Sequence, residues 1–463
     1  MKKSKAPSLL FKGSITPALL VISSAFIIVI YGILFVLTLQ FDFARRQTAS
    51  ESALNVAEAG VNYYRWHLAH DPDDYTDGTG VAGPYIHDYL DPQGNKLGQF
   101  SLEITPPANG SSLVTIRSTG WVDEFSKVSR TIEAEYGKPS FTQFSFSSNA
   151  STWYGENITV NGRVHSNNGV RMDGTNTALV TSAKATYICG SETGCSPSQT
   201  KPGVWGSGGD QGLWQFPVPT IDFESISFDF SNMRNDAQSD GLYLPSSGRR
   251  GYHILFSNDG SVRVNTVRST SYYDGYAPDD GCRRRYQRIT NEQLYGVYDV
   301  EDVPIIFAED HLWIEGTVDG RITVAAAKFP IQSNSMDIWI PNNIQYKDGD
   351  GSDALGIIAQ HDIYFARNIP EDFRIDAVLM AQQGKVIRHG YLSSCGGTSN
   401  AVKDSLTING SLISYEKSYW NFGTSPTSGF VTRQVNYDAN LLYSPPPYFP
   451  TSGDYEFISW KEE

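Results

Sequence analysis

The chain has 463 residues, of which 13% are aromatic and only 19% are charged, and its net charge is −14 at pH 7. This acidic balance, with a pI near 5.1, argues against a nucleic-acid binder, because phosphate recognition needs clustered Lys and Arg. Four cysteines are too few for a disulfide scaffold, and 42 Gly with 23 Pro favour strands and turns over helices. The composition therefore predicts a mostly β protein with room for two or three domains.

The N-terminus carries a membrane-spanning pattern. Four lysines within the first 12 residues precede the segment Gly13–Phe41, which contains no charged residue. The segment is longer than the ~20 apolar residues that cross a bilayer core and longer than the apolar part of a secretory signal. The stronger basic cluster lies before it, so the N-terminus is expected to stay in the cytoplasm. We expect a single-pass protein of the inner (cytoplasmic) membrane with nearly all of its mass outside the cytoplasm.

The helix is expected to continue beyond the membrane. Small and apolar residues recur at steps of three and four and form one stripe, which consists of Ala53, Val56, Ala57, Gly60, Val61, Tyr64 and Leu68. No proline interrupts residues 39–71, so the pattern predicts one helix over residues 14–70, after a basic leader of residues 1–13. Its first half would lie in lipid, and its second half would pack on another element.

Three strands are predicted after a connecting segment rich in Asp, Gly, Pro and Tyr. Apolar and polar residues alternate in Gly98–Thr105, Leu113–Gly120 and Lys127–Tyr136. Turn residues separate the three, which is typical of an antiparallel meander with one polar face. We expect residues 71–138 to form a small antiparallel sheet that makes one unit with the helix.

A large β-rich region is predicted for residues 139–436. A strand, a Gly and a second strand follow one another at Ile158–Val164, Leu312–Val318 and Leu406–Leu412. Glycine permits a sharp corner between two short strands, as each rung of a β-solenoid (a parallel β-helix) requires. The competing interpretation is a β-sandwich, but the unequal spacing of the copies favours stacked rungs with inserted loops.

The end of the chain and the cysteines complete the predicted architecture. Residues 437–463 include three consecutive prolines and are expected to form an extended tail. Cys189 and Cys195 are close enough in sequence for one local disulfide outside the cytoplasm, whereas Cys282 and Cys395 either pair or remain free. The predicted fold class is α+β and mostly β: a long transmembrane helix, a small antiparallel sheet and a solenoid.

The sharpest chemical motif is the loop Asp348-Gly-Asp350-Gly-Ser352-Asp353. Alternating oxygen ligands in a Gly-rich loop match the start of a Ca²⁺ site, because this cation takes about six to eight oxygens. The twelfth position of an EF-hand would be Ala359, so an EF-hand is excluded. The remaining alternatives are a Ca²⁺ loop of another kind and a simple polar turn.

Aromatic residues lie in Gly-, Ser- and Asp-rich stretches that are interpreted as inserted loops, and they suggest a recognition surface or covers for the ends of the solenoid. They are Trp205, Trp214, Phe216, Tyr272, Tyr273 and Tyr276. The basic run Arg283-Arg284-Arg285 is interpreted as a solvated loop that pairs with nearby acids, so no nucleic-acid partner is expected. No nucleophile, zinc-protease or phosphate-loop motif occurs, so no enzyme is expected.

The N-terminal third resembles type IV pilin-like proteins. The resemblance rests on the basic leader ending in Lys12-Gly13, the uncharged helix with its amphipathic second half, and the antiparallel sheet. The segment Ala57-Glu58-Ala59-Gly60 is similar to the corresponding part of PilX-type minor pilins and of the large tip pseudopilin of type II secretion. The resemblance covers residues 1–136 and implies that prepilin peptidase cuts between Gly13 and Ser14. The helix would then join other pilins or pseudopilins in a filament core.

The chain departs from the family pattern at the start of the mature helix. Filament-building pilins carry Glu at the fifth mature position, where this chain has Ala18. The departure suits a subunit at the tip, with nothing above it to register against. We therefore expect a minor pilin-like surface protein that displays its β-rich region to a surface glycan or protein, or that primes assembly. The alternative is an unprocessed membrane-anchored solenoid with a structural role in the envelope.

Overall fold

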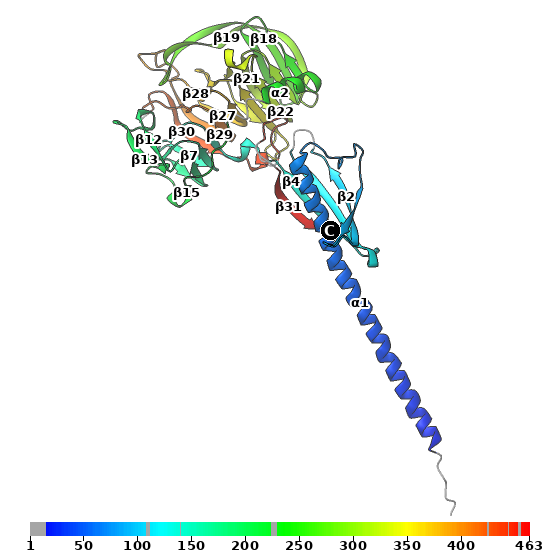
Figure 1. Ribbon diagram of the computed structural model, residues 1–463. Helices are drawn as coiled ribbons and strands as arrows, with labels where there is room; N and C mark the ends of the chain where they lie inside the picture. Colours follow the sequence, from blue (N-terminus) through cyan, green and yellow to red (C-terminus); the bar gives the residue numbers. More distant parts are fainter. Residues whose placement is uncertain are drawn as a thin grey trace, which may run out of the picture. The chain divides into compact units, whose positions relative to one another are not determined.

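The computed structural model describes residues 15–107, 112–138, 140–223, 229–423, 426–442, 444–451 and 455–463. The chain divides into two compact units (Figure 1). The first comprises residues 1–105, 115–136 and 457–463, and the second comprises residues 106–114 and 137–456. Most of the second unit is therefore a single insertion into the first.

The first unit is built on one helix, α1, which spans Thr16–His70. Pro17 lies in its first turn, where proline is tolerated, and Pro72 follows its end. The buried positions are those of the predicted stripe together with Ala49. The long helix and its packed second half are thus confirmed.

A five-stranded sheet packs on the second half of α1, in the order β1-β2-β3-β4-β31. Its strands are β1 (Tyr85–Leu90), β2 (Lys96–Thr105), β3 (Val114–Val122), β4 (Ser129–Gly137) and β31 (Glu456–Glu462). β1, β2 and β3 pair antiparallel, which confirms the predicted antiparallel sheet. Two strands were not predicted: β1 lies in the segment expected to be a connector, and β31 lies in the segment expected to be an extended tail.

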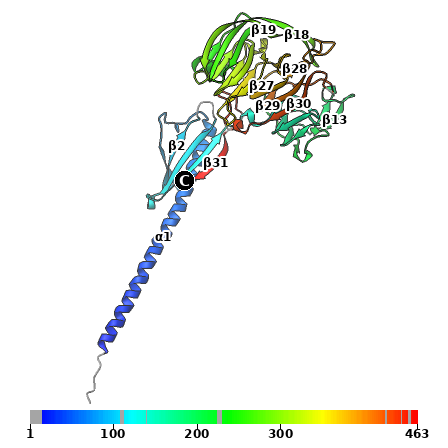
Figure 2. The ribbon, with the colours of Figure 1, turned by 180° about the vertical axis from the view of Figure 1, so that it is seen from behind.

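The last strand closes a hairpin with β4. Glu463 N–H donates to Thr131 O at 3.1 Å, whereas Phe457, at the other end of β31, contacts the Tyr136 ring at 5.7 Å. The partners run in opposite order, so the two strands are antiparallel, and Figures 1 and 2 both show β31 (red) in the sheet beside α1. The second unit is therefore inserted in the loop of this hairpin.

The strands of the second unit pair mostly in parallel. One series of ten strands, each parallel to the next, runs in the order β16 (Leu242–Leu244), β20 (Ile305–Ala308), β22 (Arg321–Ala326), β25 (Ala354–Ala359), β27 (Asp372–Ala381), β29 (Val402–Ser414), β5 (Phe146–Ser148), β8 (Val164–Ser166), β11 (Val180–Ser182) and β15 (Trp214–Gln215).

Three shorter parallel series accompany it. The first contains β17 (Gly251–Phe256), β21 (Leu312–Val318), β23 (Ile338–Ile340), β26 (Ile363–Phe365) and β28 (Val386–Arg388). The second links β21, β24 (Ile344–Tyr346), β27, β29, β30 (Gly429–Asn436), β7 (Ile158–Asn161) and β10 (Thr175–Asn176). The third contains β6 (Thr152–Tyr154), β9 (Val170–Met172) and β14 (Val204–Trp205).

Two antiparallel hairpins extend from these strands. A short one pairs β12 (Thr186–Cys189) with β13 (Gln199–Pro202). A long one pairs β18 (Ser261–Ala277) with β19 (Gly281–Asp299), and β18 also pairs antiparallel with β17. Both views show the long hairpin (green) at the outer margin of the unit.

The chain enters the long series in its middle. From β5 it runs to β15 at one end, passes through α2 (Asp229–Ser239), and resumes with β16 at the other end. It then returns strand by strand to β29, which pairs with β5. After β29 the chain continues through β30 and the Pro-rich segment to Thr451, which forms an antiparallel bridge with Ser140, so the two ends of the unit lie side by side.

Apolar side chains are buried on both faces of the long series. The inner face forms one continuous cluster with the shorter series. On the outer face, Phe230 and Met233 of α2 and Phe449 of the Pro-rich segment pack against Phe307 and Ile358. All six residues of β25 are buried for this reason.

Candidate functional site

The first half of α1 is an unpaired apolar surface. Every residue from 15 to 48 is exposed, including Ile28 at 71% and Phe41 at 68% of their surface. Among the described residues, α1 is the one helix long and apolar enough to cross a membrane. Ala18 lies in its first turn, where no acidic residue is found. The predicted cleavage residues Lys12, Gly13 and Ser14 lie outside the described residues.

The predicted assembly segment straddles the two faces of α1. Ala57 and Gly60 are buried against the sheet, Ala59 is half-buried, and Glu58 points to solvent. At Gly60 an added Cβ would lie 2.3 Å from Ser118 Oγ and 2.8 Å from a Phe100 ring carbon. The small residues of this segment therefore serve the contact between α1 and its own sheet, and Glu58 remains available to a partner.

The acidic loop at residues 348–353 is internally hydrogen-bonded. Asp350 Oδ1 accepts from the backbone N–H and hydroxyl of Ser352, at 3.0 and 2.6 Å. The two oxygens of the buried Asp353 accept from Gly320 N–H and Asp348 N–H, both at 2.7 Å. The carboxylates of Asp350 and Asp353 thus already fix the turn, and a cation here would share oxygens with these donors.

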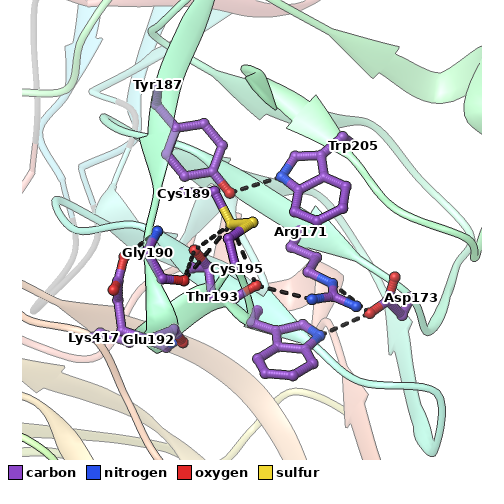
Figure 3. The surroundings of a disulfide bond; sticks show 11 residues. Arg171, Asp173, Tyr187, Cys189, Gly190, Glu192, Thr193, Cys195, Trp205 and Lys417 are labelled. Carbon is purple, nitrogen blue, oxygen red and sulfur yellow. Dashed lines mark hydrogen bonds and ion pairs between the residues drawn. A yellow bond between two sulfur atoms is a disulfide. The ribbon is translucent and has the colours of Figure 1, made fainter. Parts of the chain in front are cut away.

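A disulfide joins Cys189 and Cys195 at the end of the β12–β13 hairpin (Figure 3). Beside it, three outward residues of adjacent parallel strands are in register, namely Trp153 of β6, Arg171 of β9 and Trp205 of β14. The Arg171 guanidinium lies 4.3 Å from the Trp153 ring and 4.8 Å from the Trp205 ring. Asp173 accepts from Arg171 Nε at 2.7 Å and from Trp153 Nε1 at 2.8 Å.

Two lysines of the same chain also lie near the tryptophan rings of this Trp–Arg–Trp ladder. Lys201 Nζ lies 4.7 Å from the centre of the Trp205 ring, and Lys417 Nζ lies 6.0 Å from the centre of the Trp153 ring. These cation–π contacts hold the ladder beside the disulfide hairpin, and Trp153 remains 41% exposed. Of these three residues only Trp205 was predicted to belong to a recognition surface. Trp153 and Arg171 were not, because only the strand register brings the three side chains together.

The remaining predicted aromatics do not converge on one surface. Trp214 packs against the inner cluster and donates from Nε1 to Asn176 at 3.4 Å, whereas Phe216 is 37% exposed. Tyr272, Tyr273 and Tyr276 belong to strand β18 and not to an inserted loop. Their interpretation as loop residues is wrong because the hairpin is far longer than its Gly- and Asp-rich composition indicated.

The basic run likewise lies on a strand, β19, and not in a loop. Arg285 is ion-paired with Asp280, and Arg284 lies 3.9 Å from Asp274. Cys282 is bonded to Cys395, so the tip of the long hairpin is covalently tied to the segment after β28. The guanidinium groups therefore face neighbouring carboxylates.

A group of His and Asp side chains lies where successive parallel strands begin. His361 Nδ1 lies 3.3 Å from Asp337 Oδ1 and 3.3 Å from Asp362 Oδ2. Hydrogen bonds to both carboxylates raise the pKa of His361 to about 10. Among the described residues this is the one set of three His, Cys, Asp or Glu side chains whose donor atoms converge within 4.8 Å. This group is not evident from the sequence, because Asp337 meets His361 and Asp362 only through strand stacking.

Comparison with known proteins finds a likeness in structure but none in sequence. No protein-family model matches the chain, and no curated protein matches it in sequence. Among solved structures, the competence-associated pilin ComZ from Thermus thermophilus is similar at 14% sequence identity and a TM-score of 0.32. The match covers 90% of this chain and 98% of that chain.

Proposed function

We propose that the chain is a non-enzymatic pilin-like or pseudopilin-like subunit that assembles through α1 into, or at the tip of, a type IV pilus-type filament. The observation that carries the proposal is the division of α1 into a half packed on its own sheet and an exposed apolar half. Exposed apolar helix surface of this length needs lipid or other helices around it. A pilin-type helix has both in turn, first the bilayer and then the filament core.

The second unit is the displayed part in this proposal, and we take it to be a β-solenoid. Its support is the repeated parallel register, together with the positive φ of the corner glycines Gly162, Gly316 and Gly410, at 148°, 119° and 144°. Its role would be adhesion to a surface glycan or protein, or the priming of assembly. Ala18, in place of the usual Glu, favours a place at the tip.

The N-terminus of the membrane-extracted protein tests the proposal. Intact-mass and N-terminal peptide mass spectrometry should find a chain that begins at Ser14, with a methylated amino group. A chain that begins at Met1 contradicts the pilin route and supports the second candidate, an unprocessed membrane-anchored protein with a structural role in the envelope.

A matched pair of glycine variants makes the test specific. Gly13→Val should block the removal of the leader and keep the protein out of the sheared filament fraction. Gly32→Val places the same side chain in the exposed half of α1, where an added Cβ meets nothing within 4 Å, and should leave processing unchanged. Equal processing of both variants would contradict cleavage at Gly13.

A further inference from the structure

Titratable side chains form a column along one corner of the second unit. The parallel register aligns Leu312 with Ile338, and Ile338 with Ile363. The residues immediately before these three are His311, Asp337 and Asp362, so they stack one above another at the ~4.8 Å spacing of neighbouring strands. His361 precedes Asp362 and reaches both carboxylates. Local sequence spacing gives no hint of this arrangement.

The donor atoms have the separations of ligands around one metal ion. Zn²⁺ bonds to nitrogen and oxygen are about 2.0–2.2 Å, so neighbouring ligands in a tetrahedral or octahedral shell lie about 2.9–3.5 Å apart. The two distances from His361 Nδ1 to the Asp337 and Asp362 oxygens, both 3.3 Å, fall in this range. The two carboxylate oxygens lie within 4.8 Å of each other, so the imidazole nitrogen has a possible shared ion position with each of them.

Surrounding groups hold the two carboxylates in place. Asp362, whose side chain is 5% exposed, accepts from Lys385 N–H at 2.8 Å through Oδ1 and from the Tyr364 hydroxyl at 2.7 Å through Oδ2. Asp337 Oδ1 accepts from Asp362 N–H at 3.2 Å. Such partners orient metal ligands and fix their geometry before the ion arrives. His361 is 36% exposed, which leaves an open side for a water ligand.

We propose that Asp337, His361 and Asp362 bind a divalent transition-metal ion of the zinc class, with water completing the shell. One imidazole nitrogen with two carboxylates suits Zn²⁺, whereas Ca²⁺ requires about six to eight oxygens. His311, whose Nδ1 lies 3.7 Å from Asp337 Oδ2, is a second imidazole at the rim. The ion would tie together the starts of β23 and β26.

A second histidine in the same unit serves as the matched control. His253 also contacts two carboxylates, Glu292 at 2.8 Å and Glu315 at 3.0 Å. Those carboxylates lie on opposite ring nitrogens, so their oxygens and one nitrogen cannot surround a single ion. Both places combine one imidazole with two carboxylates, from Asp at His361 and from Glu at His253, and the carboxylates are arranged differently around the ring.

The experiment measures Zn²⁺ binding to the tag-free full chain in detergent micelles after chelator treatment. Equilibrium dialysis should give one tightly bound Zn²⁺ per chain, displaced by neither Ca²⁺ nor Mg²⁺ at equal concentration. His361→Gln and Asp337→Asn should each weaken binding at least ~10-fold, and His253→Gln should not. Absence of a tight site in the wild type, or unchanged affinity in both corner variants, would overturn the proposal.

A spectroscopic measurement on the wild type tests the metal site independently of whether the variants fold. Co²⁺ added in place of Zn²⁺ should give visible absorption bands that saturate at one equivalent and disappear when Zn²⁺ is added. A spectrum equal to that of Co²⁺ in buffer shows that the three side chains form an ion pair only.

Discussion

Two glycines allow α1 to lie very close to its sheet. At Gly120 of β3 an added Cβ would lie 2.3 Å from Ala57 N and 2.5 Å from Ala53 O, which are backbone atoms of the helix. At Gly60 of α1 it would meet the Ser118 and Phe100 side chains. At Gly120 the backbones of α1 and β3 are thus in contact, and there is no room for a side chain between them.

Gly120→Ala should therefore lower the free energy of unfolding by about 1–3 kcal/mol, because rigid backbone on both sides must shift to admit one methyl group. Thermal unfolding of the detergent-solubilised protein, followed by circular dichroism, measures the change. Gly32→Ala in the exposed half of α1 is the control and should leave the transition in place. Equal midpoints for the two variants would show that the contact is looser than described.

The ion pairs of His253 should make stability depend on pH. Burial lowers the pKa of His253, but its hydrogen bonds to Glu315 and Glu292 outweigh burial and leave the pKa above 6.5. A raised pKa stabilises the fold fully below pH ~6.5 and loses this effect as pH rises through the folded-state pKa. Burial raises the pKa of Glu315, but the hydrogen bond from His253 outweighs burial, and the net effect is a lowered pKa. The contribution of Glu315 to stability is therefore lost only as the pH falls into the acid range.

The stability difference between wild type and His253→Gln should accordingly be largest near pH 5–6 and shrink toward pH 9. Denaturant unfolding at a series of pH values measures it. A difference that does not vary with pH would mean that His253 stays neutral when folded and acts through packing alone.

At the residue scale, the sequence predicted correctly those contacts that depend on short spacings along the chain. The buried stripe of α1 follows from spacings of three and four residues, which the helix itself imposes. The Trp153–Arg171–Trp205 ladder, and the contacts of Asp337 with His361 and Asp362, instead join residues about 18 or more positions apart. Their contacts depend on which strand stacks on which, and no local pattern encodes that choice.

At the scale of elements, the long β18–β19 hairpin was not predicted, because its amino-acid composition is typical of loops. It covers a buried aromatic row in which Trp313, Trp339 and Tyr364 of successive strands are in register. Trp313 Nε1 donates to Gln287 O of the hairpin at 2.8 Å, and Lys385 Nζ lies 2.6 Å from Asp279 near the tip. The Gly- and Asp-rich stretches that suggested loops belong to strands because this row gives them a surface to cover.

The Cys282–Cys395 disulfide should contribute more to stability than the Cys189–Cys195 disulfide. The first closes a loop with a sequence separation of 113 and the second one with a separation of 6. In the chain-entropy model these lengths correspond to about 4.8 and about 2.2 kcal/mol. The double variants Cys282→Ser/Cys395→Ser and Cys189→Ser/Cys195→Ser, compared by denaturant unfolding, should rank in that order. The reverse ranking would show that the hairpin is held by its noncovalent contacts.

At the scale of the whole molecule, the decisive feature is that the second unit occupies the loop of the β4–β31 hairpin. The sequence predicted the helix and its antiparallel neighbours, but it gave no sign that the last strand returns to this sheet. Ion pairs join β31 to its neighbours, among them Arg130–Glu462 and Lys461–Glu133. A strand with such short-range polar contacts has little hydrophobic periodicity, which explains why a Pro-rich tail was predicted there.

Removal of the insertion should leave the first unit folded. A chain in which Gly137 is joined to Glu456 by four Gly/Ser residues should keep protected backbone amides in β4 and a protease-resistant core in detergent. The same chain without residues 456–463 should lose that protection, because β4 becomes an edge strand. Equal hydrogen exchange in the two chains would contradict a structural role for β31.

The bridge between Ser140 and Thr451 also determines how the protein bears a mechanical load. If a surface holds the second unit while α1 is pulled, the tension enters that unit through two stretches of chain that are bridged at Ser140 and Thr451. The outermost strands, β15 and β16, are then outside the force path and cannot be peeled away one at a time. The two bridged stretches of chain share the load, so this attachment suits a subunit that works under tension.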